Sequence, residues 1–214
     1  MNEYEMLMGL IRARRSIRRF SARAVGRDDI LRLVEAARWA PSNHNRQPWR
    51  FIVVEEKREI EQLAERVGTK LSEKLKSLPR IASSYAGDFS NYATFFSEAP
   101  VLLVVLHKRP ISLSHSLLKD SSQPELVSGE PLSAAMAVQN LLLAAHALGL
   151  GSCVLTAPLI VQEAVLGALN LPAGYDVTCL VAIGYAGETP PQPRRKGIEQ
   201  IMEFRKYEGR LERK

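Results

Sequence analysis

The sequence has little of what metal sites, disulfide scaffolds and membrane spans require. It contains only two cysteines, Cys153 and Cys179, and these do not form a closely spaced pair. With four scattered histidines, this spacing argues against a zinc site. Both cysteines lie in apolar runs and are expected to be buried, reduced thiols. The N-terminus lacks an apolar core of signal-peptide length, and no apolar run reaches the ~18–20 residues that span a bilayer. These absences favour a cytoplasmic protein with no membrane partner.

A Rossmann-type dinucleotide turn is also missing, because no GxGxxG sequence follows a predicted strand. The overall composition is that of an ordinary globular protein, with 46% hydrophobic and 24% charged residues. A chain of 214 residues is long enough for one domain with a sizeable core. We therefore expect a single domain over residues 1–214.

Positive charge is in excess, with a net charge of +6, and it gathers in two places. Between Glu5 and Asp28 the chain carries seven arginines and no acid. These are Arg12, Arg14, Arg15, Arg18, Arg19, Arg23 and Arg27. The second cluster is Arg194, Arg195 and Lys196. Taken alone, such a run is more often a solvated basic face than a site. Nucleic-acid binding would call for interleaved aromatics or a recognition motif, and only Phe20 is nearby.

Hydrophobic periodicity predicts five helices and four strands. The helices are expected over residues 4–14, 28–40, 57–75, 131–148 and 160–169, and the strands over 51–55, 101–106, 153–155 and 177–183. Because the strands do not alternate strictly with the helices, an α+β sandwich is favoured over a doubly wound sheet. Residues 79–91 are expected to be a loop, and residues 108–129 a variable lid or insertion. Trp39 and Trp49 are expected to be packing residues.

The predicted helix over residues 131–148 has almost no polar face, so it is expected to be buried nearly all round. A single small domain rarely buries a helix so completely, and a partner subunit is one way to do it. Gly149 is expected to end this helix as its C-terminal cap.

Four segments contain groups suited to binding. In the first, Arg14, Arg15, Ser16 and Arg18 offer guanidinium forks and a hydroxyl that can hold a phosphate. The second, residues 42–48, carries three amides between two prolines, which suits a heteroaromatic ring, although an ordinary turn is the alternative. The third, residues 148–158, has two glycines that allow backbone to approach a flat ligand or simply make a turn. In the fourth, a proline-stiffened loop after residue 187 brings Arg194 and Arg195.

Together these segments resemble the nitroreductase family of flavoproteins. The matching sequences are Arg-Arg-Ser-Ile-Arg-Arg-Phe at 14–20, Ala-Pro-Ser-Asn-His-Asn-Arg-Gln-Pro-Trp at 40–49, Ala-Leu-Gly-Leu-Gly-Ser-Cys at 147–153, and Ile-Gly-Tyr at 183–185 followed by Pro-Arg-Arg at 193–195. The resemblance implies a nitroreductase-like sandwich with a central mixed, mainly antiparallel sheet flanked by helices. It also implies an intertwined homodimer with two FMN sites at the subunit interface.

The resemblance also implies roles for individual residues. Arg14, Arg15 and Ser16 would bind the phosphate and ribityl chain, and Arg18 the pyrimidine edge of the ring. Ser42, Asn43, Asn45 and Gln47 would be the loop donated by the other subunit, and Leu155 and Thr156 would lie against the flavin N5 side through their backbone. Arg194 and Arg195 would complete the phosphate site, and Asn91 would reach the ring.

Two features depart from the family pattern. Many members carry a lysine shortly after the position of Asn91, and here Thr94 stands near that place, which leaves Arg18 as the cation at the N1/O2 edge. Residues 108–129 match no family pattern.

The function expected from this resemblance is an FMN-dependent oxidoreductase that uses NAD(P)H to reduce nitroaromatics, quinones or related acceptors by ping-pong hydride transfer. The chemistry would take place at flavin N5, and no side chain would act as a catalytic base or nucleophile. Two alternatives stay open: a flavin-using enzyme of the same fold that fragments flavin or removes halogen reductively, and a basic nucleic-acid-binding or scaffold domain.

Overall fold

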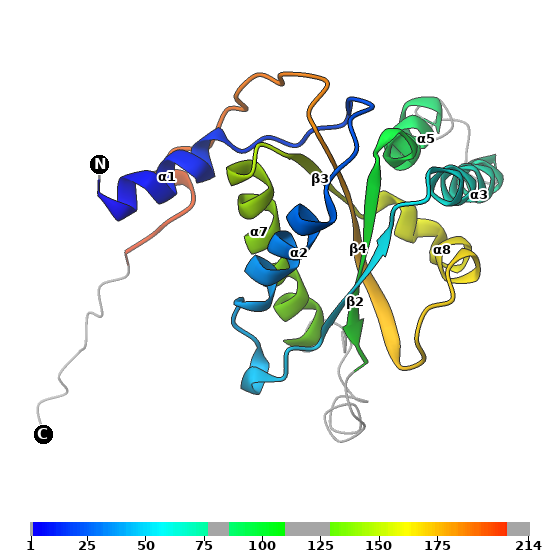
Figure 1. Ribbon diagram of the computed structural model, residues 1–214, viewed down its shortest axis with the longest axis horizontal. Coiled ribbons are helices and arrows are strands. Elements are labelled where there is room, and N and C mark those ends of the chain that lie inside the picture. The colour runs from blue at the N-terminus through cyan, green and yellow to red at the C-terminus, as the bar shows by residue number, and fades with distance from the viewer. Residues whose placement is uncertain (1, 77–85, 110–128, 205–214) are drawn as a thin grey trace, which may run out of the picture.

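The computed structural model describes residues 2–76, 86–109 and 129–204, and its centre is a four-stranded sheet in the order β1-β2-β4-β3 (Figure 1). The strands are β1 (Trp49–Val54), β2 (Val101–Lys108), β3 (Gly151–Leu155) and β4 (Tyr175–Gly184). The three strand pairs are all antiparallel. A parallel bridge between Ser16 and Ser152 adds the N-terminal run to the free edge of β3. The sheet is therefore mixed but mainly antiparallel, as expected.

Strand β2 is central because its first six residues are apolar and alternate between the two faces of the sheet. Leu102, Val104 and Leu106 belong to the core on one face. Val101, Leu103 and Val105 belong to the core on the other face. All six side chains are buried, so helices must cover both faces.

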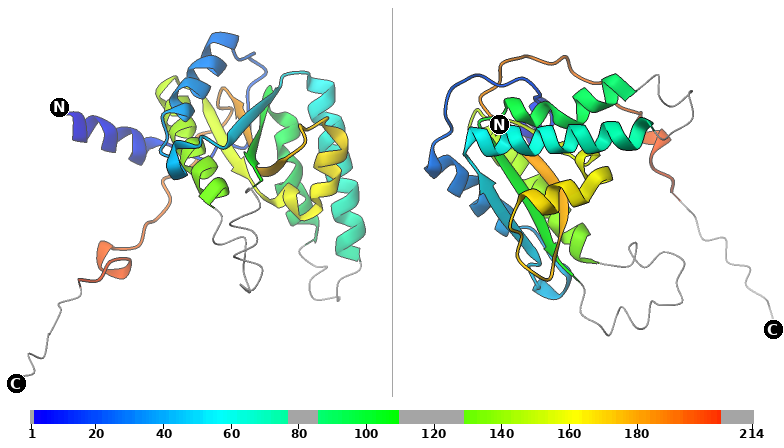
Figure 2. Two further views of the ribbon diagram at one scale, coloured as in Figure 1. Left: turned by 90° about the horizontal axis from the view of Figure 1, so that it is seen from below. Right: turned by 90° about the vertical axis from the view of Figure 1, so that its right-hand side faces the viewer.

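Helices flank the sheet on both sides and form a three-layer sandwich (Figure 1). One face is covered by α2 (Arg27–Arg38) and α7 (Gly129–Ala147). The other is covered by α3 (Lys57–Lys76), α5 (Ala86–Thr94) and α8 (Gln162–Ala168), with the short turns η2 (Phe95–Glu98) and η4 (Ala157–Val161). The two views in Figure 2 show the same layers from below and from the side. The predicted α+β fold is confirmed.

Helix α7 buries only one side within this chain. Ala137, Leu141 and Ala145 are fully buried, whereas Leu132 is 62% exposed and Met136 41% exposed. The expected burial all round is therefore not reached by a single chain. The helix ends as predicted, with Gly149 in the left-handed conformation at φ 74°.

Helix α1 (Glu3–Ala13) projects from the body of the molecule (Figure 1). Its start is fixed by a capping box between Asn2 and Glu5. None of its residues is buried, and Tyr4, Met6, Leu7 and Ile11 are exposed. Near the end of the described chain, Ile198 in the turn η5 (Ile198–Gln200) is exposed in the same way, as are Ile201, Met202 and Phe204 after it.

Two sequence predictions about local structure were wrong. Part of the expected loop over residues 79–91 is helix α5; residues 79–85 lie outside the described part of the chain. This helix depends on tertiary contacts, since Ala93 is fully buried in the core that α3 also lines. Trp39 was expected to pack, but it is 74% exposed and donates its indole N–H to Glu35. Trp49 packs against the core as expected.

Other predictions concern the cysteines and the insertion. Cys153 and Cys179 are both buried and free, as predicted. Most of the expected insertion at residues 108–129 lies outside the described residues. Among the described helices, none is long and apolar enough to cross a membrane.

Candidate functional site

The arginine run after α1 is attached to the edge of the sheet by backbone contacts. Ile17 N donates to Ser152 O at 3.1 Å, next to the bridge between Ser16 and Ser152. The Ile17 side chain is buried and occupies the space beside Gly151, where a β-carbon would stand 2.8 Å from Ile17 Cγ1. Gly151 is thus needed for packing against Ile17, a role that neither the expected approach of a flat ligand nor the simple turn predicted.

A second attachment comes from the segment that follows β4, residues 185–197, which we call the strap. Ser21 N donates to Tyr185 O at 2.9 Å, and Gly187 N donates to Arg19 O at 2.8 Å. The Glu188 carboxylate accepts from two successive backbone N–H groups, those of Arg18 at 2.6 Å and Arg19 at 3.2 Å. The backbone of the arginine run is therefore held between β3 and the strap.

The guanidinium groups of Arg14, Arg15 and Arg18 stay available to a ligand as far as the described residues show. Among the described residues, no carboxylate forms an ion pair with the side chain of Arg14, Arg15 or Arg18. Arg15 Nη1 donates to the carbonyls of Arg12 and Arg14 at 2.6 and 2.8 Å, which leaves other donors of its fork for a ligand. The Arg18 guanidinium lies 5.6 Å from the centre of the Tyr92 ring on α5. Such an arrangement favours an anionic ligand.

Cys153 follows Ser152, the residue of β3 that pairs with Ser16 of the arginine run. Burial raises the pKa of the Cys153 thiol, whereas the charge of Arg18, a hydrogen bond with Ser16 and the charge of Arg14 lower it. The charges of Arg14 and Arg18 therefore act at this position of β3. With its pKa raised on balance, the thiol is a neutral packing group and a poor nucleophile.

The amide loop, residues 42–47, folds back on itself around the turn η1 (Asn43–Asn45). Ser42 Oγ accepts from Gln47 N at 3.0 Å, and Gln47 Nε2 donates to Asn45 Oδ1 at 3.2 Å. His44, Asn45 and Gln47 have φ values of 50°, 51° and 47°. Left-handed conformations outside glycine cost on the order of 1 kcal/mol each, so this loop stores strain of the kind found at functional sites.

The first turn of α7 supports this loop. Asn43 N donates to Ser133 Oγ at 3.2 Å, and Ser133 Oγ in turn donates to Gly129 O at 2.6 Å. Arg46 Nη1 lies 3.4 Å from Oε1 of Glu130, whose residue is only 6% exposed. Sequence reasoning missed Ser133 and Glu130. The sequence feature that could have revealed them is the presence of these two polar residues at the start of the otherwise apolar helix α7.

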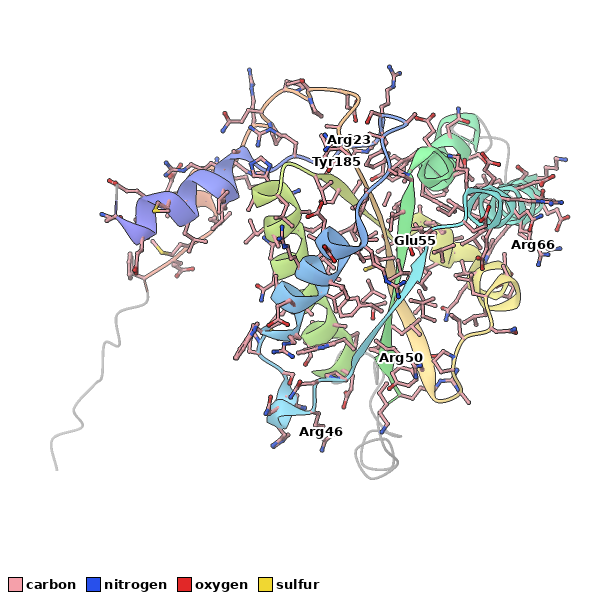
Figure 3. All side chains as sticks on the ribbon, in the orientation of Figure 1. Arg23, Arg46, Arg50, Glu55, Arg66 and Tyr185 are labelled. Carbon is pink, nitrogen blue, oxygen red and sulfur yellow. The ribbon has the colours of Figure 1, made fainter. Side chains whose placement is uncertain are left out.

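The arginine run and the amide loop lie at opposite ends of α7. The loop contacts the first turn of the helix, whereas the arginine run pairs with β3, which follows the last turn. A helix of 19 residues is about 28 Å long. Figure 3 shows the separation, with Arg46 at the lower end of the molecule and Arg23 and Tyr185 at the upper end. One chain therefore does not bring the two predicted halves of the site together.

The remaining predicted residues lie near the arginine run or on the strap. Leu155 ends β3 and is buried in the core, and Thr156 after it is exposed. Asn91 is exposed on α5 beside Tyr92, whose ring contacts Arg18. Arg194 and Arg195 are exposed on the strap, beyond the hydrogen bonds made by Gly187 and Glu188. Within the described part of the chain, neither one is hydrogen-bonded to Arg14, Arg15 or Ser16.

Thr94 does not take the place of the lysine common in the family. Its methyl group faces α3, where a β-carbon on Gly68 would stand 3.4 Å away. Its hydroxyl donates to Ser90 O at 2.9 Å. The residue is therefore committed to packing between α5 and α3.

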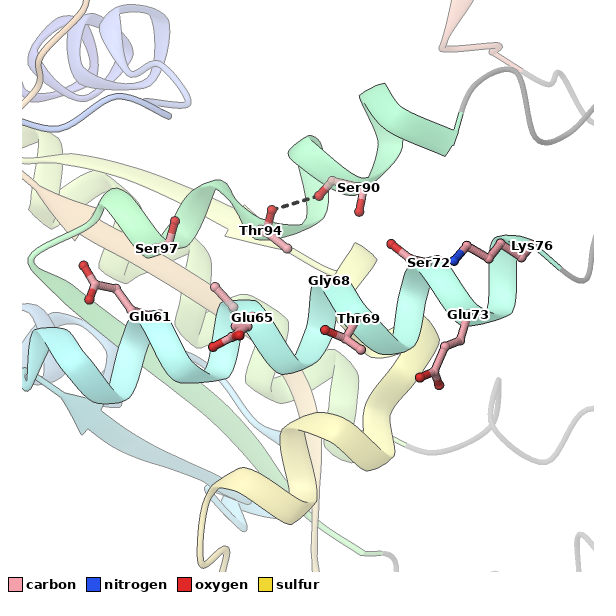
Figure 4. Close-up of a pocket in the computed structure, with 11 residues that line it drawn as sticks. Glu61, Glu65, Gly68, Thr69, Ser72, Glu73, Lys76, Ser90, Thr94 and Ser97 are labelled. Atoms are coloured by element: carbon pink, nitrogen blue, oxygen red, sulfur yellow. Dashed lines mark hydrogen bonds between the residues drawn. The ribbon is translucent and has the colours of Figure 1, made fainter.

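A groove of about 660 Å³ runs between α3 and the α5–η2 segment (Figure 4). Its lining includes Glu61, Glu65, Thr69, Ser90 and Thr94, and no predicted site residue lines it. In the part of the chain that the structure describes, no group of three His, Cys, Asp or Glu side chains is placed to hold a metal ion.

Solved structures identify the class of protein to which this architecture belongs, that of the flavoproteins with a nitroreductase-like fold. The chain is similar to a BluB-like flavoprotein from Clostridium difficile 630, with a TM-score of 0.80 and 26% identity, over 94% of this chain and 99% of that one. It is also similar to a nitroreductase with bound FMN from Desulfitobacterium hafniense DCB-2, with a TM-score of 0.70 and 25% identity, over 96% and 100% of the two chains.

Sequence comparison identifies the family. Residues 11–185 match the Nitroreductase family, so this chain belongs to that family. An iodotyrosine deiodinase from Thermotoga neapolitana is 28% identical over 204 residues, which cover 94% of this chain and 100% of the relative. The predicted family is confirmed, and the roles of the individual site residues stay predictions.

Proposed function

We propose that this protein is an FMN-dependent oxidoreductase that takes electrons from NAD(P)H and reduces nitroaromatics, quinones or related acceptors. The observation that carries the proposal is the arginine run itself, whose backbone is held between β3 and the strap while its guanidinium groups have no carboxylate partner among the described residues. A group of cations on an anchored backbone fits an anionic phosphate. The family membership and the FMN-bound structural relative support flavin as the carrier of that phosphate.

The phosphate end would be held by Arg14, Arg15 and Ser16. Ser16 already pairs with Ser152 on β3, and the charge of Arg14 acts at the neighbouring Cys153. Arg15 keeps donors that are not used by the carbonyls at the end of α1. Arg194 and Arg195 would approach from the strap and add bidentate, charge-assisted bonds.

The ring end would be held by Arg18, with Asn91 from α5 and the backbone of Leu155 and Thr156 nearby. When bound, FMN would supply the redox chemistry, accepting a hydride from NAD(P)H and passing two electrons to the acceptor in a ping-pong cycle. Arg18 would hold a fixed positive charge at the edge of the ring where negative charge develops on reduction. No side chain of the chain needs to act as nucleophile or base, and the buried Cys153 thiol is held neutral.

The complete site would require a second subunit. The amide loop with Ser42, Asn43, Asn45 and Gln47 is at the far end of α7 from the arginine run, so a partner chain would supply it. The exposed apolar residues Leu132 and Met136 of α7, together with those of α1, would be covered in such a homodimer. The two free cysteines suit a reducing compartment such as the cytoplasm.

The first test is spectroscopic. Purified protein is expected to be yellow or to become so with added FMN, with absorbance that NADH or NADPH bleaches and an acceptor restores. A colourless protein that binds no FMN in a fluorescence titration would overturn the proposal. The ratio of kcat/KM for the two nicotinamide donors would then give the donor preference.

Reductive dehalogenation is a second candidate, favoured by the similarity to the Thermotoga neapolitana deiodinase along the whole of that relative. The two candidates share the flavin site and differ in the acceptor. Iodide release from iodotyrosine, measured beside nitroaromatic reduction with the same reduced protein, separates them. Nitroaromatic reduction without iodide release would remove the second candidate.

A further inference from the structure

We propose that Glu188 is a positioning residue for Arg18, and that its carboxylate fixes the arginine run so that the Arg18 guanidinium stays at the edge of the flavin ring. The inference rests on the proposed function and names a determinant of the same site. One carboxylate oxygen, Glu188 Oε1, accepts from Arg18 N at 2.6 Å and from Arg19 N at 3.2 Å. Two successive N–H groups that converge on one anion form a backbone nest, and charge-assisted bonds of this kind are strong.

The contact restrains the backbone at a residue whose side chain has few other restraints. The Arg18 residue is exposed, and its long side chain has considerable rotamer freedom. Its guanidinium touches Tyr92, at 5.6 Å from the ring centre. Ile17 N is bonded to β3 and Arg19 O to Gly187 N, so the Arg18 peptide lies between two fixed points. Glu188 closes this gap by bonding the N–H of Arg18 itself.

The charge of Glu188 works against the role proposed for Arg18, and this makes the inference testable. A carboxylate close to the arginine run reduces the positive potential there, and its charge also raises the pKa of the Cys153 thiol. If Glu188 acted by charge alone, removing it would make the ring edge more positive. If Glu188 acts by position, removing its hydrogen bonds would make the edge less positive, because Arg18 would move away.

Glu188→Gln and Glu188→Ala separate the two effects. The glutamine keeps an acceptor oxygen for the two N–H groups but removes the charge, whereas the alanine removes both. The measurement is a sulfite titration of the FMN-loaded protein, because sulfite binds oxidised flavin more tightly when positive charge lies near the N1/O2 edge. We expect Glu188→Ala to raise the sulfite dissociation constant about tenfold, as lost charge-assisted hydrogen bonds typically do. Glu188→Gln is expected to leave it unchanged or to lower it.

Arg18→Ala provides the reference. The double variant Arg18→Ala, Glu188→Ala is expected to bind sulfite like Arg18→Ala alone, because Glu188 acts through Arg18. If Glu188→Ala instead binds sulfite as Glu188→Gln does, the positioning role is overturned. If Arg18→Ala retains FMN and leaves sulfite binding unchanged, the assignment of Arg18 within the proposed function fails instead.

A readout without flavin tests the contact directly. Amide hydrogen exchange at residues 18 and 19 in the flavin-free protein is expected to be faster in Glu188→Ala than in the parent, and unchanged in Glu188→Gln. Unchanged exchange in the alanine variant would contradict the proposal whether or not the protein binds FMN. Thermal unfolding of each variant shows whether a change is confined to this contact.

Discussion

Gly129 lies so close to Asn43 that a β-carbon at position 129 would stand 2.8 Å from Asn43 Nδ2 and 3.1 Å from Asn43 Cβ. The first residue of α7 and the amide loop are therefore fitted to each other. This contact gives a way to disturb the loop without touching the arginine run.

Gly129→Ala is expected to displace Asn43 and to weaken FMN binding about tenfold, the size of one or two lost hydrogen bonds. The change is read by fluorescence titration with FMN. Gly167→Ala in α8 is the matched control, because a β-carbon there would meet nothing within 4 Å. The control should raise the free energy of unfolding by about 0.5–1 kcal/mol and leave FMN affinity unchanged. Equal FMN affinity in both variants would remove Asn43 from the site.

Gly151→Ala should disturb the other half of the site. The new methyl group would lie 2.8–2.9 Å from three carbons of the Ile17 side chain, so the arginine run must move away from β3. We expect the free energy of unfolding to fall by about 1–3 kcal/mol, as overpacking does, with a parallel loss of FMN affinity.

Gly149→Ala is the control for that variant. Gly149 has φ 74°, so alanine there costs about 1–2 kcal/mol of conformational strain without any contact. Denaturant unfolding should show similar destabilisation for both variants, and only Gly151→Ala should lose FMN affinity. Loss of flavin in both would mean that stability alone controls binding.

Arg195→Glu tests the phosphate end. Reversal of one charge in the strap should weaken FMN binding about tenfold at low salt, and the difference should shrink as salt screens the charges. Arg58→Glu on the exposed side of α3 changes the net charge by the same amount and is expected to bind FMN as the parent does. Identical salt dependence in the two variants would exclude Arg195 from the site.

The buried thiol of Cys179 should make stability fall at alkaline pH. Burial raises the pKa of this thiol from 9.0 to about 12, so the unfolded chain loses the proton at a lower pH than the folded chain does. The free energy of unfolding should therefore decrease between pH 9 and 12, by at most about 1.4 kcal/mol per pH unit from this group. Cys179→Ala removes this contribution. Urea unfolding across that range measures it, and equal slopes for the variant and the parent would contradict the prediction.

Helices and strands with a strong hydrophobic pattern over a short stretch of sequence could be predicted. Strand β2 and helix α7 follow from continuous apolar runs, and Gly149 follows from its place after the last apolar turn. Helix α5 was missed because its short sequence carries little periodicity and depends on packing against the core beside α3. The burial of Trp39 was predicted wrongly, because the sequence does not say which side chains at the end of a helix face solvent.

The candidate site was recognisable from the sequence only as separate pieces. The family motifs pointed to the arginine run and the amide loop, but not to the residues that support them. Glu188 is 170 positions from Arg18, and Ser133 is 90 positions from Asn43. Contacts at such separation are decided by the fold and leave no local pattern in the sequence.

The strap has a consequence for how the protein is made. Arg18 is synthesised 170 positions before Glu188, to which its backbone is bonded. Contacts between such distant parts form late in folding. A nascent chain that stops before the strap would lack the bonds that Tyr185, Gly187 and Glu188 make to the arginine run, so retention of FMN should begin only after the strap has been made.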